Sequence, residues 1–244
     1  MDTRTLEENQ KLIAAARPFR EPMLSQLRKY YRIGLTWSSN ALEGNTLTES
    51  ETKVLLEDGL TVGGKPLRDT YEAVGHAKAY DFMFTLLRGN RVTEENIRFM
   101  HYLFYKDIDS TCAGEYRTVP VFISGSAHPV TAAADIPRAM EGLIRWEDTM
   151  DSLHPVEAAA LIHQKFVFIH PFIDGNGRVG RLLMNTVLIQ RGYLPIIIPP
   201  IRRLEYIQLL EKAHEDVNPF IDFIAEMEIQ SQEEIIRLLH LDKP

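Results

Sequence analysis

The sequence HPFIDGNGRVGR occupies residues 170–181, between two strongly apolar segments of the chain. It brings a histidine, an aspartate, two arginines and several glycines into one short stretch. A glycine-rich break at the start of a helix leaves backbone N–H groups unpaired, and the helix dipole adds partial positive charge there. The composition therefore predicts a phosphate-binding site, and a plain corner between two helices is the less favoured interpretation.

Each residue type in this stretch suits one part of phosphate chemistry. Gly175 and Gly177 are expected to let a phosphate approach the backbone. Arg178 and Arg181 can then bind the remaining oxygens, while the Asn176 side chain can donate to a developing negative charge. We expect these residues to form an anion site at the start of the following helix.

Two further residues of the stretch indicate group transfer rather than binding alone. Polyphosphates normally carry Mg²⁺, which takes hard oxygen ligands, so Asp174 is the candidate metal ligand. His170 lies close by, and an imidazole with an ordinary pKa of about 6.5 is largely neutral at pH 7 and can accept a proton from an attacking hydroxyl. Zinc ligation by His170 is the competing interpretation. It is weak because the nearest histidine, His163, has no carboxylate partner on the same face.

The bulk composition bounds the class of protein. The 244 residues, 45% hydrophobic, suffice for one sizeable core, so we expect one compact unit with an N-terminal extension. The net charge is −7, and no stretch gathers the basic residues that a nucleic-acid partner requires. The single cysteine, Cys112, favours a reducing compartment. No segment reaches about 18 consecutive apolar residues, which predicts a soluble cytoplasmic protein with no membrane partner.

Helical periodicity dominates the chain, and most of the expected helices begin at a capping residue. Thr48 with Glu51 makes a capping box, and Thr93 opens another helix. Pro155 stands at the expected first position of a helix that is apolar nearly all round, which places that helix in the middle of a bundle. The remaining helices are expected from residue 135 onward and over residues 178–191, 202–215 and 219–239.

One segment, residues 117–130, favours an extended chain. Its β-branched and aromatic residues suit strands, while Pro120 and Pro129 restrict it to edge pairing. We expect a small two-stranded flap whose free edge receives an extended segment of a partner protein. The flap residues are Val121, Phe122, Ile123, Ser124, Gly125 and Ser126.

Residues 170–181 resemble the signature His-Pro-Phe-x-Asp/Glu-Gly-Asn-Gly-Arg-x-x-Arg of the Fic family, without a departure. The likeness extends upstream through residues 114–117 and 153–157. It implies an all-α fold, a Fic-type helical bundle with a small β-hairpin flap. We divide the chain accordingly into an N-terminal helical extension, a Fic core domain, and a C-terminal helix end with a tail. These parts comprise residues 1–68, 69–228 and 229–244.

The resemblance also implies an activity. Fic proteins are mostly adenylyltransferases, which move AMP from ATP to a Ser, Thr or Tyr hydroxyl of a protein. The target would be another protein or the chain itself, and a homo-oligomer is left open. The likeness makes His170 the base, Asp174 the Mg²⁺ ligand, Gly175, Asn176 and Gly177 the α-phosphate site, and Arg178 and Arg181 the ligands of the outer phosphates. Tyr206 and Asn185 are candidates for the adenine pocket.

A second stretch, SSNALEG at residues 38–44, is similar to the inhibitory motif of autoinhibited Fic proteins. Ser39 and Glu43 are four residues apart, on one face of a helix that Gly44 is expected to end. The likeness implies that Glu43 pairs with Arg181 and obstructs the γ-phosphate. Two alternatives stay open: a de-AMPylating phosphodiesterase that uses Glu43, and a non-catalytic nucleotide-binding signalling module.

Overall fold

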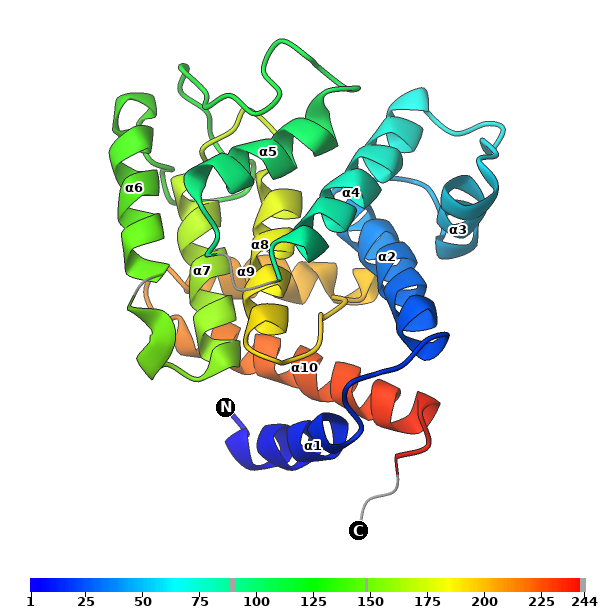
Figure 1. Ribbon diagram of the computed structural model, residues 1–244. Helices are drawn as coiled ribbons and strands as arrows, with labels where there is room; N and C mark the ends of the chain where they lie inside the picture. Colours follow the sequence, from blue (N-terminus) through cyan, green and yellow to red (C-terminus); the bar gives the residue numbers. More distant parts are fainter. Residues whose placement is uncertain (88–90, 148, 242–244) are drawn as a thin grey trace.

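The computed structural model describes residues 1–87, 91–147 and 149–241, and all regular elements in these ranges are helical (Figure 1). The α-helices are α1 (Thr3–Ala15), α2 (Met23–Ala41), α3 (Glu49–Asp58), α4 (Leu67–Thr85), α5 (Glu94–Tyr105), α6 (Ile136–Glu147), α7 (Pro155–Ile169), α8 (Asn176–Gln190), α9 (Arg203–Lys212) and α10 (Asn218–Leu238). The expected all-α bundle is confirmed.

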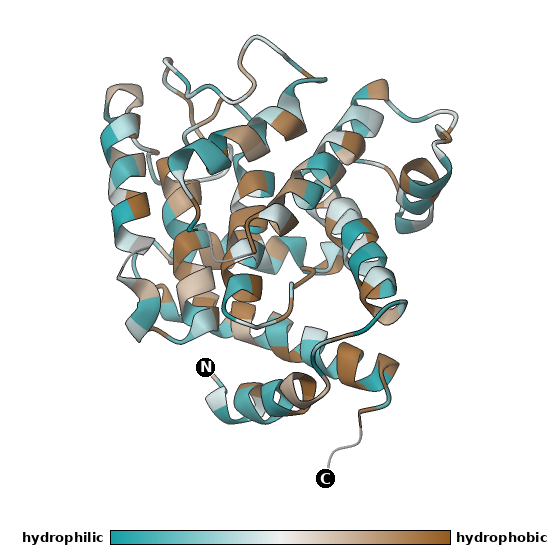
Figure 2. Ribbon diagram, viewed as in Figure 1, coloured by the Kyte–Doolittle hydropathy of each residue, from teal (hydrophilic) through white to brown (hydrophobic). Residues whose placement is uncertain are grey.

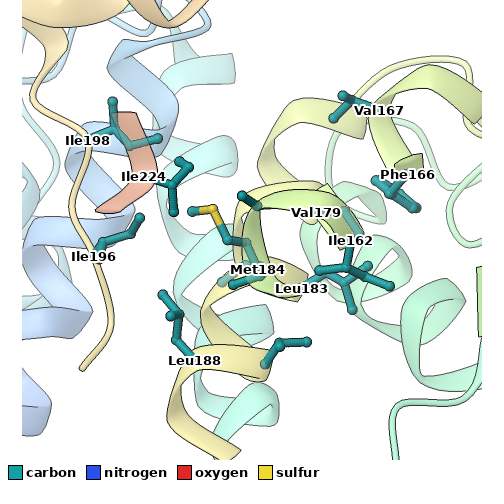
Figure 3. Packing of buried hydrophobic residues seen from close by; sticks show 14 of the residues in the cluster. Ile162, Phe166, Val167, Val179, Leu183, Met184, Leu188, Ile196, Ile198 and Ile224 are labelled. Carbon is teal, nitrogen blue, oxygen red and sulfur yellow. The ribbon is translucent and has the colours of Figure 1, made fainter. Parts of the chain in front are cut away.

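Helices α7 and α8 lie side by side at the centre of the bundle (Figure 1). Pro155 is the first residue of α7, as the sequence predicts, and Phe166 in its fourth turn has no exposed surface. Figure 3 shows side chains of α7 and α8, among them Ile162 and Leu183, packed together in the core. Each such fully buried side chain contributes roughly 1.5–3 kcal/mol. This pair holds the connecting residues 170–175 in a fixed position.

The other helices surround this pair. Helices α2, α4 and α5 contact α8, and α6 packs against α7. Helix α10 crosses below them, with α1 against it (Figure 1). Figure 2 shows that apolar residues are concentrated on the central helices. Within the described ranges, no helix is long and apolar enough to cross a membrane.

The caps that begin two of the surrounding helices follow from the sequence. Thr48 accepts a hydrogen bond from the backbone N–H of Glu51, and the Glu51 side chain accepts one from Thr48 N, so the predicted capping box of α3 is confirmed. Thr93 caps α5 in the same way, with Asn96 as its partner. Helix α10 runs without a break through residue 228, where the sequence division places a boundary.

The prediction of a β-hairpin over residues 117–130 was wrong, because this segment contains no strand. Pro120 and Pro129 have no N–H to donate to a ladder, and the buried side chain of Arg117 takes up the carbonyls that a partner strand would use. It donates to the carbonyl oxygens of Val119, at 3.1 Å, and of Thr131. The flap is therefore a loop whose two ends both accept hydrogen bonds from Arg117.

Candidate functional site

The site is built where α7 ends. His170 terminates α7 in the left-handed conformation, with φ 52° and ψ 58°, and its backbone N–H donates to Phe166 O at 3.0 Å. This conformation is uncommon for a residue with a β-carbon and turns the chain sharply out of the helix. The His170 ring lies 3.4 Å, through Nδ1, from the Val167 carbonyl oxygen. Donation there leaves Nε2 as the proton-accepting atom.

The electrostatic surroundings of His170 favour its neutral form. Burial lowers the pKa of His170 below its ordinary value, and the Arg117 guanidinium lowers it further. A neutral imidazole at pH 7 has the protonation state that a base requires.

The Asn176 side chain holds the loop between the two helices. It accepts a hydrogen bond from Phe172 N and donates one to Phe172 O, both at 2.9 Å. Both polar atoms of its amide thus contact the Phe172 backbone, and only 2% of the residue is exposed. Asn176 shapes the loop in this structure, and its role in anion binding stays a prediction.

Helix α8 begins directly after Gly175, which has φ 81°. Its first N–H groups carry the partial positive charge of the helix N-terminus. A β-carbon on Gly177 would meet a carboxylate oxygen of Glu43, so the absence of a side chain is what lets Glu43 approach this end of the helix. The anion position of α8 is covered by a carboxylate of the protein itself.

Arg181 binds this carboxylate. Its Nη2 donates to Glu43 Oε1 and to the Ser39 carbonyl oxygen, both at 2.8 Å, and its Nε donates to Ser39 Oγ at 2.9 Å. Arg181 is 4% exposed, whereas 35% of the Glu43 side chain is exposed. Burial by itself raises the pKa of Glu43, but the attraction of Arg181 and Arg178 and the hydrogen bond from Arg181 together outweigh it, so the pKa lies below its ordinary value. Both residues of the inhibitory motif thus contact the last arginine of the signature.

The turn that carries Glu43 differs from the expectation. Helix α2 ends at Ala41, so Glu43 lies in the turn that follows and not in the last helical turn. Gly44, with φ 96°, completes that turn. The Leu42 carbonyl oxygen accepts a hydrogen bond from Arg203 Nε at 2.6 Å, which ties the turn to α9.

Asp174 is held between two arginines. Its Oδ1 accepts from Gly175 N at 2.6 Å and from Arg178 Nη2 at 3.1 Å, and its Oδ2 accepts from Arg68 Nη2 at 2.7 Å. Burial acts to raise the pKa of Asp174, but Arg178 and these hydrogen bonds lower it below its ordinary value. Asp174 is therefore ionised at neutral pH.

Arg178 contacts residues of α4 and α5. It is 3% exposed, forms ion pairs with Glu72 at 3.0 Å and Asp174 at 3.1 Å, and lies 4.5 Å from the ring centre of Phe104. In this structure it orients the Asp174 carboxylate, whereas Arg181, one turn later on α8, pairs with Glu43.

A cavity of about 310 Å³ opens beside His170, a volume suited to a small-molecule ligand. His170, Gly177 and Arg181 line it, with Glu43 at its border and the flap residues Ile123, Ser124 and Ser126 on another wall. The structure thus brings the base, the helix terminus and one signature arginine to a single cavity.

The two adenine-pocket candidates lie in different places. Tyr206 lines the cavity, accepts from Arg181 Nη1 at 3.3 Å, and lies 2.7 Å, through its hydroxyl, from His163 Nε2. The Asn185 amide is buried outside the cavity, where its Nδ2 donates to Arg181 O and its Oδ1 accepts from Ile196 N at 2.7 Å. In this structure Asn185 organises the core.

Several residues of the site were missed from the sequence. Arg68 and Glu72 reach it from α4, a helix for which no cap or motif gave a signal. His101 donates from Nε2 to the Asp174 carbonyl oxygen at 3.1 Å, accepts from Gly114 N, and its ring stacks on Phe172 at 3.8 Å. Isolated histidines and arginines carry no spacing signal, so only the fold reveals these contacts.

Comparison with known proteins agrees with this geometry. A family model described as Fic/DOC family matches residues 91–188. Protein adenylyltransferase Fic of Drosophila grimshawi is 38% identical over 194 residues, which are 78% of this chain and 40% of the relative. The Drosophila ananassae protein of the same name is 39% identical over 189 residues, 76% of this chain and 38% of that relative. The chain thus spans about two fifths of the length of the curated relatives it matches.

Solved structures share the whole fold. Fic-1 from C. elegans superimposes with a TM-score of 0.89 at 28% identity, covering 98% of this chain and 73% of that one. A Fic domain containing signaling protein from Bacteroides thetaiotaomicron has a TM-score of 0.86 at 28% identity and covers 94% of this chain and 95% of its own. The sequence match, the shared fold and the geometry of residues 170–181 together show that the chain belongs to the Fic/DOC family.

Proposed function

We propose that this chain is a protein adenylyltransferase that moves AMP from ATP to a Ser, Thr or Tyr hydroxyl of a protein. The observation that carries the proposal is the shared cavity of His170, the α8 N-terminus and Arg181. Relatives at 38% identity carry the name protein adenylyltransferase. Simple nucleotide binding needs an anion site but no neutral base beside it, so the non-catalytic alternative is less favoured.

The proposed reaction uses each of these groups once. His170 Nε2 accepts the proton of the target hydroxyl, whose oxygen attacks the α-phosphorus of ATP. The bond from that phosphorus to the pyrophosphate oxygen breaks, so AMP ends on the protein and pyrophosphate leaves. The backbone N–H groups at Gly175–Gly177 stabilise the charge on the α-phosphate, and Arg181 binds the outer phosphates. Arg178 is assigned to the orientation of Asp174.

Asp174 is the proposed ligand of Mg²⁺. The described residues offer no group of three His, Cys, Asp or Glu side chains that holds a metal alone. A single ionised carboxylate nevertheless fits an ion that takes its other ligands from phosphates and water. The Asp174 side chain is 39% exposed, so its Oδ2 becomes available to a metal ion once the ion pair with Arg68 breaks. The ion would neutralise charge on the outer phosphates.

We propose that Glu43 inhibits this activity. Its carboxylate covers Gly177 and binds the Arg181 nitrogen that the outer phosphates need. Two anions cannot occupy one guanidinium edge, so ATP binds productively only when the turn after α2 moves.

The placement of Glu43 also favours a second candidate function. A carboxylate fixed beside the phosphate position can orient a water molecule and remove AMP from a modified protein. This de-AMPylating reaction would need Glu43, whereas the transfer reaction is inhibited by it.

Radiolabelled ATP distinguishes these functions. The wild type and Glu43→Gly are incubated with ATP labelled at the α-phosphorus and Mg²⁺, and label is followed on the chain itself and on proteins of a lysate. The proposal expects weak labelling by the wild type and strong labelling by Glu43→Gly. A hydrolytic enzyme would instead lose AMP removal in that variant, and a pure binding module would show no covalent label in either form.

A further inference from the structure

Arg117 is a buried cation without an anionic partner. It is 5% exposed, and no carboxylate of residues 1–87, 91–147 or 149–241 lies within ion-pair distance of it. Burial lowers the pKa of Arg117, with no acidic group opposing that change. A buried charge without an ion-pair partner is unfavourable unless hydrogen bonds satisfy it, so the Arg117 guanidinium depends on its hydrogen bonds.

Its hydrogen bonds join the base to the flap. Nε donates to the carbonyl oxygen of His170 at 2.8 Å, Nη1 to that of Val119 at 3.1 Å, and Nη2 to that of Thr131. The Arg117 backbone N–H donates to Pro171 O at 2.9 Å. Val119 and Thr131 stand at the two ends of the flap loop, so one planar guanidinium contacts both ends and the residue of the base.

The contact with His170 falls where the backbone needs support. His170 holds a left-handed conformation that residues with a β-carbon rarely adopt. The hydrogen bond from Arg117 to the His170 carbonyl oxygen holds this left-handed backbone, on which the imidazole is mounted, at the turn from α7 into the signature loop. The flap meanwhile lines the same cavity through Ile123 and Ser124.

We propose that Arg117 is a positioning residue that fixes the His170 ring and the flap relative to each other, so that a hydroxyl presented by the flap meets the base in one geometry. This inference rests on the proposed function. The positive charge gives a second effect, because a guanidinium beside His170 disfavours protonation of the ring. A purely structural anchor of the flap would have neither effect on His170.

The test uses Arg117→Lys and Arg117→Gln in the full chain carrying Glu43→Gly. Lysine keeps the charge but lacks the planar fork that reaches several carbonyls, whereas glutamine loses the charge as well. Arg98→Lys is the matched control, since Arg98 Nε also donates to a carbonyl, that of Gly114 at 2.8 Å, while the rest of its guanidinium contacts Glu115 and the ring of Tyr116. Thermal unfolding establishes that each variant is folded.

Self-modification by labelled ATP is measured together with ATP affinity. We expect Arg117→Lys to lower the transfer rate by roughly tenfold or more, the scale of one or two lost hydrogen bonds, with ATP affinity changed less than about twofold. The Arg98→Lys control keeps the parent rate. Transfer at the parent rate in folded Arg117→Lys, or a loss of ATP affinity as large as the loss of rate, overturns the proposal.

Two measurements need no catalysis and separate this inference from the proposed function. The titration of the His170 ring, followed by NMR and identified with His170→Asn, should move to higher pH in Arg117→Gln and stay near the parent midpoint in Arg117→Lys. Chymotrypsin cleavage after Phe122, a residue 90% exposed on the flap, should be several-fold faster in both variants. If neither measurement changes, Arg117 does not connect the flap and His170, whatever reaction the protein catalyses.

Discussion

The carboxylate of Glu43 lies over the α-carbon of Gly177, in the space that a β-carbon would occupy on any other residue. The same carboxylate binds Arg181 at 2.8 Å, so it covers both the helix N-terminus and the arginine that follows it one turn later. Glu43 and Arg181 are 138 residues apart in sequence. Their fit depends on glycine at position 177.

Gly177→Ala should therefore disturb the closed state. The added methyl meets Glu43 Oε1 and Arg181 Nη1, so we expect a lower melting temperature and weaker ATP binding, because the methyl also obstructs a phosphate. Gly142→Ala is the control: a β-carbon there meets nothing within 4 Å, and alanine favours a helix by about 0.5–1 kcal/mol. Calorimetric titration measures the affinity of both variants for ATP. An unchanged affinity in Gly177→Ala would contradict this geometry.

The ion pair itself is examined by graded substitutions at Glu43. Glu43→Gln keeps the shape but loses the charge, so it should release activity less than Glu43→Gly does. Because the Glu43 side chain is 35% exposed, we expect a loss of stability of only about 1 kcal/mol. The double variant Glu43→Gly with Arg181→Ala should return to low transfer rates, since the released arginine is missing. High activity in the double variant would remove Arg181 from the proposed role.

The pH dependence follows from His170. Its folded pKa is lower than the ordinary 6.5, so the base form persists below that pH. Transfer by Glu43→Gly should be constant above pH 6.5 and decline only at lower pH, as protonation removes the base. The stabilisation linked to this shift is present above the unfolded pKa and is lost as pH falls through the folded pKa. A rate that already halves above pH 7 would contradict a depressed pKa.

Replacement of His170 separates the base from the fold. His170→Asn is preferred to alanine because asparagine tolerates the left-handed conformation better. We expect a loss of about 10²–10⁴ in transfer rate, with the melting temperature and ATP affinity nearly unchanged. Mass spectrometry of the AMP adduct gives the rate, and transfer at the parent rate would show that another group accepts the proton.

The metal proposal depends on Asp174. Asp174→Asn should abolish transfer at Mg²⁺ concentrations that saturate the parent, and EDTA should silence the parent itself. Asp107→Asn serves as the control, because Asp107 is also a partly exposed carboxylate in an ion pair, with Lys78 at 3.0 Å. Metal-independent transfer would contradict the assignment of Asp174.

Sequence patterns located most of what the site needs. The Thr48 capping box and the Pro155 helix start are confirmed because both depend on side-chain rules that act within one helical turn. The anion site was predicted for the same reason, since its residues lie within residues 170–181. The contact of Glu43 with Arg181 required the family likeness, because no local rule joins residues so far apart.

What the sequence missed depends on tertiary packing. The strand propensity of residues 117–130 was overridden because Arg117 binds the carbonyls at both ends of the flap. The assignments of Arg178 and Asn176 to phosphate binding stay predictions, but their partners in the protein were not foreseen. Arg178 pairs with Glu72 of α4, whose proximity only the fold creates, and the Asn176 amide contacts the backbone of Phe172.

Arg181 makes its contacts with Ser39, Glu43 and Tyr206 in a fully packed setting. On the proposed function, Arg181 has a counter-ion in both states, because Glu43 serves before the nucleotide arrives and a phosphate would serve afterwards. Activation on this scheme is an exchange of one anion for another at constant local charge. The midpoint of the exchange then depends on the concentration of ATP as well as on the strength of the contact between Glu43 and Arg181. The proposed activity would therefore respond to the nucleotide level of the surroundings.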